Sequence, residues 1–251
     1  MATVISFANQ KGGVAKTTSA FNVAACLAKK GKRTLMIDLD PQASLTIYAG
    51  LEPYEYDKGI AAVLRSPRQD VRECIVEIRE CLDIIPSRIE LAGAENELLS
   101  RTARELILSR ALSKVRDGYD FIVIDCPPQL STLTINALAC TDKVIIPCKT
   151  DYLAYRGIKQ LLETVDTVRA YFKPDIEVLG LLATLYESRA KDDQEILELL
   201  REEYTVLGVV KRTTQAKKGM YDGLSSVEFA PKSDLAQQYE MLVDSVILKQ
   251  Y

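Results

Sequence analysis

Two lysines on either side of a glycine pair are the residues best suited to chemistry in this chain. The segment that carries them is Lys11-Gly12-Gly13-Val14-Ala15-Lys16-Thr17-Thr18. It follows an apolar run at residues 4–8, an order that predicts a strand, a glycine-containing loop and a helix. Such a loop directs backbone N–H groups and the positive end of a helix dipole at one point, where a triphosphate fits. Lys16 can then reach the β- and γ-phosphates, and the Thr17 hydroxyl can hold Mg²⁺.

The loop departs from the strict phosphate-loop pattern G-x-x-x-x-G-K-[ST]. Gln10 stands at the first glycine position and Ala15 at the second. We therefore expect Gly12 and Gly13 to supply the conformational freedom, and we expect a negative φ at Ala15, whose Cβ is otherwise poorly tolerated. The alternative is a glycine-containing turn before an ordinary helix.

Carboxylates end two further apolar runs. Asp125 closes the run at residues 121–125, and Asp38 and Asp40 close the run at 34–40. Buried parallel strands present such groups at the ligand-binding edge of a sheet, where Asp125 can hold Mg²⁺ directly or through water. Asp38 and Asp40 point the same way on an extended segment, and a cation would offset their repulsion. The alternative for either residue is a turn or cap before Pro41.

Composition narrows the classes of function. The chain has 251 residues, no histidine and a net charge of −3. The absence of histidine excludes histidine-based catalysis and typical zinc sites, so an aspartate is the best candidate to orient an attacking water. The net charge means that DNA binding must come from a local patch. No leader or 20-residue apolar run is present, and the scattered cysteines are expected to be buried thiols.

The coarse pattern alternates strands and helices. The expected strands are residues 4–8, 34–38, 82–86, 121–125, 143–148, 178–185 and 205–210. The expected helices are residues 17–30, 89–99, 103–116, 132–139, 158–172, 192–204 and 233–249. The strands are almost continuously apolar, which predicts an α/β fold with a doubly wound, mostly parallel sheet and helices on both faces. We interpret residues 1–251 as a single domain, with residues 51–79 as an irregular insertion at the sheet edge.

Three motifs in the right order resemble the ParA family of deviant Walker-type ATPases, within the ParA/MinD superfamily. They are FANQKGGVAKTT, LMIDLDPQAS and FIVIDCPPQLSTLTINAL, and the likeness continues through IPCKTDYLAYRGIKQL. The resemblance implies a P-loop NTPase-like fold, ATP and Mg²⁺ as cofactors, and a homodimer that sandwiches two ATP molecules. It also implies that Lys11 reaches the nucleotide of the partner subunit.

The resemblance assigns further roles residue by residue. Lys16 and Thr17 would bind the phosphates and Mg²⁺ of their own subunit, and Thr18 would contact phosphate. Asp40 would orient the hydrolytic water. Asp38 and Asp125 would support the metal. Arg212 would border the adenine, and Ala15, where the family usually has glycine, bears on the rate of hydrolysis.

Two basic clusters could bind DNA. The larger comprises Lys211, Arg212, Lys217 and Lys218, within eight residues that contain no acid. The smaller comprises Arg189 and Lys191, and Arg189 matches a basic position that the resembled family uses for DNA. Contacts of this kind to phosphates carry no sequence information and weaken steeply with salt. The alternative is a solvated loop and helix face, and Arg212 can serve the nucleotide instead of DNA.

The resulting interpretation is a cytoplasmic, nucleoid-associated partition ATPase. ATP drives dimerisation, the dimer binds double-stranded DNA nonspecifically, and a centromere-binding ParB-like partner stimulates hydrolysis and release. One alternative is a membrane-associated positioning ATPase similar to MinD, but the last expected helix is acidic opposite its apolar face, so no membrane binding is expected. Further alternatives are an iron–sulfur reductase using Cys126 and Cys140, and a nucleotide-gated scaffold with negligible turnover.

Overall fold

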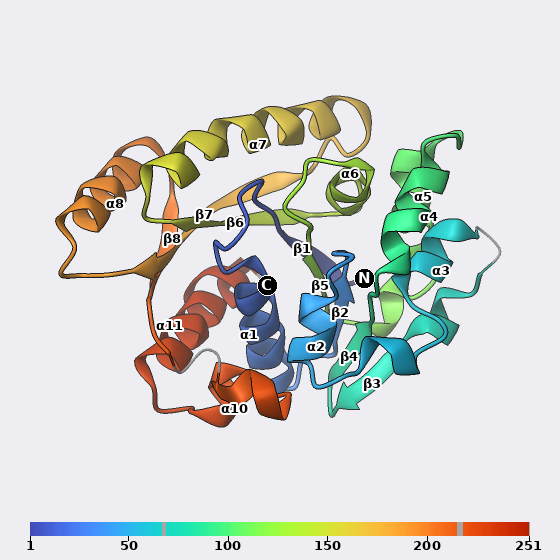
Figure 1. Cartoon of the computed structure of the whole chain (residues 1–251), viewed down its shortest axis with the longest axis horizontal. Helices are drawn as coiled ribbons and strands as arrows, with labels where there is room; N and C mark the ends of the chain where they lie inside the picture. The colour runs from blue at the N-terminus through green and yellow to red at the C-terminus, as the bar shows by residue number, and fades with distance from the viewer. Residues whose placement is uncertain (67–68, 215–217, 251) are drawn as a thin grey trace.

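A central eight-stranded sheet organises the computed structural model, which describes residues 1–66, 69–214 and 218–250. The strands are β1 (Thr3–Phe7), β2 (Thr34–Asp38), β3 (Val76–Arg79), β4 (Leu82–Ile85), β5 (Phe121–Asp125), β6 (Lys143–Lys149), β7 (Glu177–Tyr186) and β8 (Val206–Lys211). They lie in the order β3-β4-β2-β5-β1-β6-β7-β8 (Figure 1). Only the β3–β4 pair is antiparallel among these strands. The doubly wound, mostly parallel sheet predicted from the sequence is confirmed.

Helices cover both faces of the sheet. They are α1 (Lys16–Lys29), α2 (Ser44–Tyr48), α3 (Ile60–Arg65), α4 (Glu90–Leu98), α5 (Ile107–Leu112), α6 (Thr132–Leu138), α7 (Tyr152–Tyr171), α8 (Lys191–Glu203), α10 (Ser226–Phe229) and α11 (Asp234–Leu242). Apolar side chains of α1, α2, α10 and α11 pack on one face, and those of α3 to α8 pack on the other. Short 3-10 segments lie at Pro53–Glu55, Val71–Cys74, Arg104–Leu106, Arg116–Gly118, Gly219–Asp222 and Leu248–Gln250.

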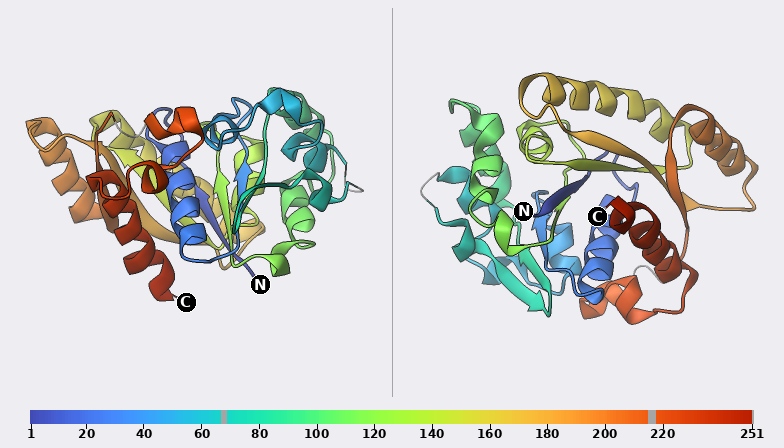
Figure 2. Two further views of the ribbon diagram at one scale, coloured as in Figure 1. Left: turned by 90° about the horizontal axis from the view of Figure 1, so that it is seen from below. Right: turned by 180° about the vertical axis from the view of Figure 1, so that it is seen from behind.

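The C-terminal helix docks on the protein's own core. Figure 2 shows α11 beside α1, and α11 continues through a π-helical stretch at Val243–Ile247. Tyr239 is fully buried and shares a hydrogen bond of 3.0 Å with Ser19. At the end of α1, Lys29 and Lys30 pair with Glu240 and Asp244. This packing agrees with the expectation of a docked helix. No described helix combines the length and apolarity needed to span a bilayer.

The short helices α2 and α10 were not expected, and three other regions differ clearly from the expectation. The region expected to be irregular contains α3 and the edge strand β3, whose four residues include the polar Glu77 and Arg79 and give too short a pattern to predict. Helix α7 begins at Tyr152, six residues early, because the Asp151 carboxylate accepts a hydrogen bond from the Ala154 N–H at 2.8 Å. The expected helix at 103–116 is broken into α5 and two 3-10 turns.

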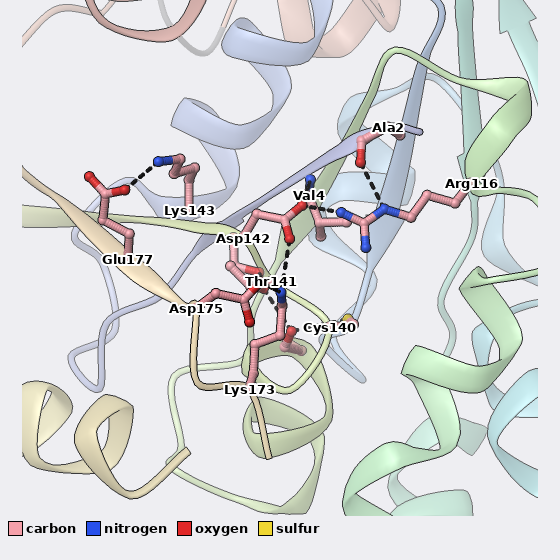
Figure 3. A network of polar contacts seen from close by, with 12 residues as sticks. Ala2, Val4, Arg116, Cys140, Thr141, Asp142, Lys143, Lys173, Asp175 and Glu177 are labelled. Carbon is pink, nitrogen blue, oxygen red and sulfur yellow. Dashed lines mark hydrogen bonds and ion pairs between the residues drawn. The ribbon is translucent and has the colours of Figure 1, made fainter. Parts of the chain in front are cut away.

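A network of polar contacts joins the amino-terminal ends of β1 and β6 (Figure 3). These ends lie opposite the carboxyl ends of the parallel strands. Asp142, just before β6, accepts a hydrogen bond of 2.9 Å from the backbone N–H of Val4 in β1. It also pairs with Arg116 and, at 3.2 Å, with Lys173 at the end of α7. Arg116 donates to the Ala2 carbonyl at 2.7 Å. These charge-assisted hydrogen bonds stabilise the starts of β1 and β6. The network therefore lies away from the carboxyl ends of the strands, where the candidate site is found.

Candidate nucleotide-binding site

The loop between β1 and α1 is held in place by the neighbouring strands. Asn9 donates to the Pro147 carbonyl in β6 at 2.7 Å and accepts from the Lys11 N–H at 3.0 Å. Thr184 in β7 donates to the Val14 carbonyl at 3.0 Å. Within the part of the chain that the structure describes, no side chain caps the N-terminus of α1. The first N–H groups of this helix therefore remain available for an anionic ligand.

Ala15 adopts a left-handed conformation, with φ 59° and ψ 33°. The expectation of a negative φ is therefore wrong. Hydrogen bonds hold the chain on both sides of Ala15: Thr184 donates to the Val14 carbonyl, and the Ser19 N–H donates to the Ala15 carbonyl at 3.0 Å. For a residue with a Cβ the left-handed conformation costs roughly 1–2 kcal/mol. Gly13, at φ 70°, bears no such cost.

Substituting glycine for Ala15 is expected to stabilise the fold by up to about 1 kcal/mol, because the relieved strain exceeds the added entropy of the unfolded chain. Urea unfolding measures the difference. Ala190→Gly is the matched control, since Ala190 has φ −85° and gains only the entropic penalty. An Ala15→Gly variant destabilised as much as Ala190→Gly would contradict the strain.

Two carboxylates lie side by side beneath the loop. The register of β2 and β5 pairs Asp38 with Asp125. Asp38 accepts hydrogen bonds of 2.8 Å from both the N–H and the hydroxyl of Thr46, and burial raises its pKa to about 6. Both oxygens of Asp125 are buried, and neither forms a well-made hydrogen bond to any residue that the structure describes. Burial and the charge of Asp38 raise the pKa of Asp125 well above its ordinary value, and the nearby Thr17 hydroxyl opposes this rise.

An unpartnered buried carboxylate next to a second one fits a divalent cation. The described residues contain no cluster of three or more metal-ligating His, Cys, Asp or Glu side chains. Mg²⁺ would therefore rely on one or two protein groups together with phosphate oxygens and water, as is usual for nucleotide-bound Mg²⁺. Asp125 and the Thr17 hydroxyl are the groups placed to contribute, with Asp38 behind them.

The two lysines have different environments. Lys16 is 7% exposed, and its Nζ donates to the Lys11 carbonyl at 3.0 Å. Burial lowers its pKa, and the charges of Asp125 and Asp40 oppose that shift. Lys11 turns away from the loop, and its Nζ lies 2.7 Å from Asp151 Oδ1. Sequence reasoning missed Asp151, whose only local signal is its position before a helical pattern.

Asp151 joins two lysines at the start of α7. Lys149 Nζ approaches its other oxygen at 3.2 Å, and the carboxylate also caps the helix. Burial alone would raise the pKa of Asp151, but the hydrogen bonds from Lys11 and from the Ala154 N–H hold it below its ordinary value. Lys11 is thus held by an ionised residue of its own chain.

A cavity of about 950 Å³ lies over the loop, a size that suits a small-molecule ligand. Of the predicted nucleotide-binding residues, it is lined by Gly12, Gly13, Ala15, Lys16, Thr17, Thr18, Asp40 and Arg212. Lys11 and Val14 are not in its lining. Tyr48, Leu185 and Glu187 also line it, and sequence reasoning missed them. Arg212 and Glu187, which both line the cavity, form an ion pair of 2.6 Å.

Four of the predicted DNA-binding residues lie near the ends of β7 and β8, namely Arg189, Lys191, Lys211 and Arg212. Arg189 is exposed in the turn after β7, and Lys191 is exposed at the start of α8, 3.6 Å from Glu195. Lys211 ends β8, and its Nζ lies 3.9 Å from Asp234. Lys218 is exposed. Lys217 lies outside the described residues. Arg212 lines the cavity and is neutralised by Glu187, which favours a role toward the nucleotide.

The cysteines do not suit a metal cluster shared across a dimer. Cys126 and Cys140 are buried, and burial raises the pKa of the Cys140 thiol to about 12 and that of Cys126 further. The iron–sulfur alternative is therefore not supported by the geometry.

This chain is similar to known proteins over most of its length. A family model described as an AAA domain matches residues 2–178. The sporulation initiation inhibitor protein Soj of Bacillus subtilis is 36% identical over 98% of both chains. A structure named cobyrinic acid a,c-diamide synthase from Mycobacterium smegmatis, with bound ATP analogue and magnesium, is 35% identical, with a TM-score of 0.86 over 100% of this chain and 96% of that one.

A putative plasmid partition protein from Borrelia burgdorferi bound to AMPPNP is 26% identical, with a TM-score of 0.85 over 100% of both chains. The family model covers more than half of this chain, and Soj matches nearly all of it. The nucleotide loop, the paired strand-end carboxylates and these relatives lead to one assignment. The chain belongs to the ParA family of deviant Walker-type ATPases.

Proposed function

We propose that this protein is an ATP-driven partition switch that alternates between a DNA-bound dimer and a free monomer. The observation that carries the DNA half of the proposal is the position of the exposed basic residues. Arg189 and Lys191 follow Glu187 in the chain, Lys211 precedes Arg212, and both Glu187 and Arg212 line the nucleotide cavity. Occupation of the cavity can therefore affect the surface that would hold DNA phosphates.

The cavity is suited to hold ATP with Mg²⁺. The N–H groups at the start of α1 and the Lys16 ammonium would bind the phosphates, and Thr17 with Asp125 would hold the metal. Mg²⁺ when bound supplies charge neutralisation at the transferring phosphoryl group. Asp40, which lines the cavity, would orient the attacking water. Its Oδ1 accepts a hydrogen bond of 2.9 Å from the Gln42 N–H, which fixes the carboxylate.

Dimerisation would transfer Lys11 from Asp151 to the nucleotide of the partner subunit. Tyr152 and Leu153, the first residues of α7, are 57% and 72% exposed beside this ion pair. Exposed large apolar side chains next to a charged residue of the site are suited to burial between two copies of the chain. A ParB-like centromere-binding partner would stimulate hydrolysis and so release the dimer from the nucleoid.

Sedimentation velocity with ATP and Mg²⁺ tests the proposal. The expected result is a dimer that binds a nonspecific DNA duplex only when ATP is present and dissociates from it as salt rises. An ADP sample is the control. A dimer that ignores DNA at low salt would contradict the DNA half, and binding to anionic vesicles instead would favour the MinD-like alternative. A chain that stays monomeric with ATP would contradict the trans role of Lys11.

A further inference from the structure

The turn at residues 187–190, which carries Arg189, is fixed by the first turn of α8. Asp193 Oδ2 accepts a hydrogen bond from the Glu187 N–H at 2.8 Å. The Gln194 side-chain amide donates to the Ser188 carbonyl at 2.7 Å. The Ala190 N–H closes the turn by donating to the Glu187 carbonyl at 2.9 Å. The backbone on both sides of Arg189 is therefore held.

The same carboxylate connects this turn to the loop that follows β6. Asp193 Oδ2 also accepts a hydrogen bond of 2.7 Å from the hydroxyl of Thr150, which is buried. Thr150 directly precedes Asp151, the residue that pairs with Lys11. One carboxylate thus links the turn of Arg189 to the segment that holds Lys11.

The turn is also connected to the nucleotide cavity. Glu187 lines the cavity and pairs with Arg212, and the Arg212 N–H donates to the Tyr186 carbonyl at 3.0 Å. Three residues before Glu187, Thr184 holds the Val14 carbonyl of the phosphate loop. Asp193 therefore anchors a turn that contacts the cavity at one end and exposes a basic side chain at the other.

We infer that Asp193 is a positioning residue for DNA binding: it fixes the turn so that Arg189 is presented to a DNA phosphate. This inference rests on the proposed function, in which Arg189 contacts DNA. The expected change in DNA affinity on removing Asp193 is opposite in sign to the change expected from charge alone. Asp193 is an acid close to the basic surface, so removing its charge should by itself strengthen binding to a polyanion. Loss of the hydrogen bonds that Asp193 makes to the turn should instead weaken DNA binding.

Asp192 provides a matched control. It lies in the same first turn of α8 and is exposed, and its carboxylate makes no hydrogen bond or ion pair within residues 1–66, 69–214 and 218–250. Asp192→Ala and Asp193→Ala remove the same charge from almost the same place, and both lose a similar interaction with the helix dipole. Only Asp193→Ala releases the turn.

Fluorescence anisotropy with a nonspecific duplex, in ATP and Mg²⁺ at fixed salt, measures the difference. Asp192→Ala should bind DNA as tightly as the unmodified protein or more tightly. Asp193→Ala should bind about tenfold more weakly, near the level of Arg189→Ala, because both lose one charge-assisted phosphate contact. The double variant should be no weaker than Arg189→Ala alone, since the two residues act through one contact. Asp193→Asn, which keeps an acceptor, should recover most of the affinity.

The outcomes separate this inference from the function on which it rests. If Arg189→Ala binds DNA normally, the proposed DNA surface is wrong. If Arg189→Ala weakens binding but Asp193→Ala behaves like Asp192→Ala, the positioning role is overturned while DNA binding stands. ATP affinity and thermal unfolding are measured alongside. A loss of DNA affinity in Asp193→Ala that Asp193→Asn does not recover would also overturn the role.

Discussion

Asp40→Ala is expected to lower ATP turnover by about 10²-fold or more, because a positioned carboxylate that orients water contributes on that scale. Nucleotide binding should change little, since the phosphate contacts come from Lys16, Thr17 and the backbone of the loop. Asp40 lines the cavity, and its backbone carbonyl is separately fixed by the Ser87 hydroxyl at 2.7 Å. The loop should therefore keep its shape when the carboxylate is removed.

Steady-state phosphate release and fluorescent-nucleotide titration measure turnover and binding separately. Glu52→Ala, an exposed acid outside the cavity lining, controls for the loss of one negative charge. Asp40→Asn distinguishes the charge from the shape of the side chain. Unchanged turnover in Asp40→Ala would contradict the role of this residue in orienting the hydrolytic water. It would favour the alternative of a nucleotide-gated scaffold.

The Lys11–Asp151 ion pair is expected to control ATP-dependent dimerisation. Lys11→Ala should abolish the ATP-dependent dimer and with it most turnover, because each nucleotide loses its contact from the partner subunit. Asp151→Asn should act in the opposite direction and strengthen dimerisation roughly 30-fold, since a partly exposed ion pair holds Lys11 in its own chain by about 1 kcal/mol in each of the two subunits. Asn caps helices as well as Asp does, so α7 should be preserved.

Sedimentation equilibrium in a non-hydrolysable ATP analogue measures the dimer constant for each variant. Lys149→Ala is the companion variant, because Lys149 shares the Asp151 carboxylate without belonging to the loop. A weaker dimer in Asp151→Asn would mean that this carboxylate acts across the interface rather than within the monomer.

The parts of the site that lie within single motifs could be predicted from the sequence. A buried strand that ends in Asp fixes where that carboxylate lies, so Asp38 and Asp125 are neighbours once β2 and β5 pair. The glycine pair and Lys16 fix the loop and the start of α1 in the same way. Continuous apolar runs predicted the parallel strands because both faces of the sheet are covered.

Contacts between distant segments could not be predicted in this way. The φ of Ala15 depends on a bond to Val14 from Thr184, and Lys11 meets Asp151 only because β1 and β6 are adjacent. From the local sequence, Asp193 is an ordinary acidic residue in the first turn of a helix, and its contacts with Thr150 and Glu187 could not be predicted. Strand β3 has only four residues and is half exposed, so no periodicity distinguishes it from a loop.

The central position of β1 has a consequence for synthesis of the chain. β1 is made before β5 and β6, between which it lies, so its partner strands begin to leave the ribosome more than a hundred residues later. At typical translation rates of about 5–20 residues per second, that delay is on the order of 6–20 s. During this time the phosphate loop has no strand on either side to support it. The nucleotide-binding site therefore forms late in translation. Until then the phosphate loop is exposed to chaperones and proteases.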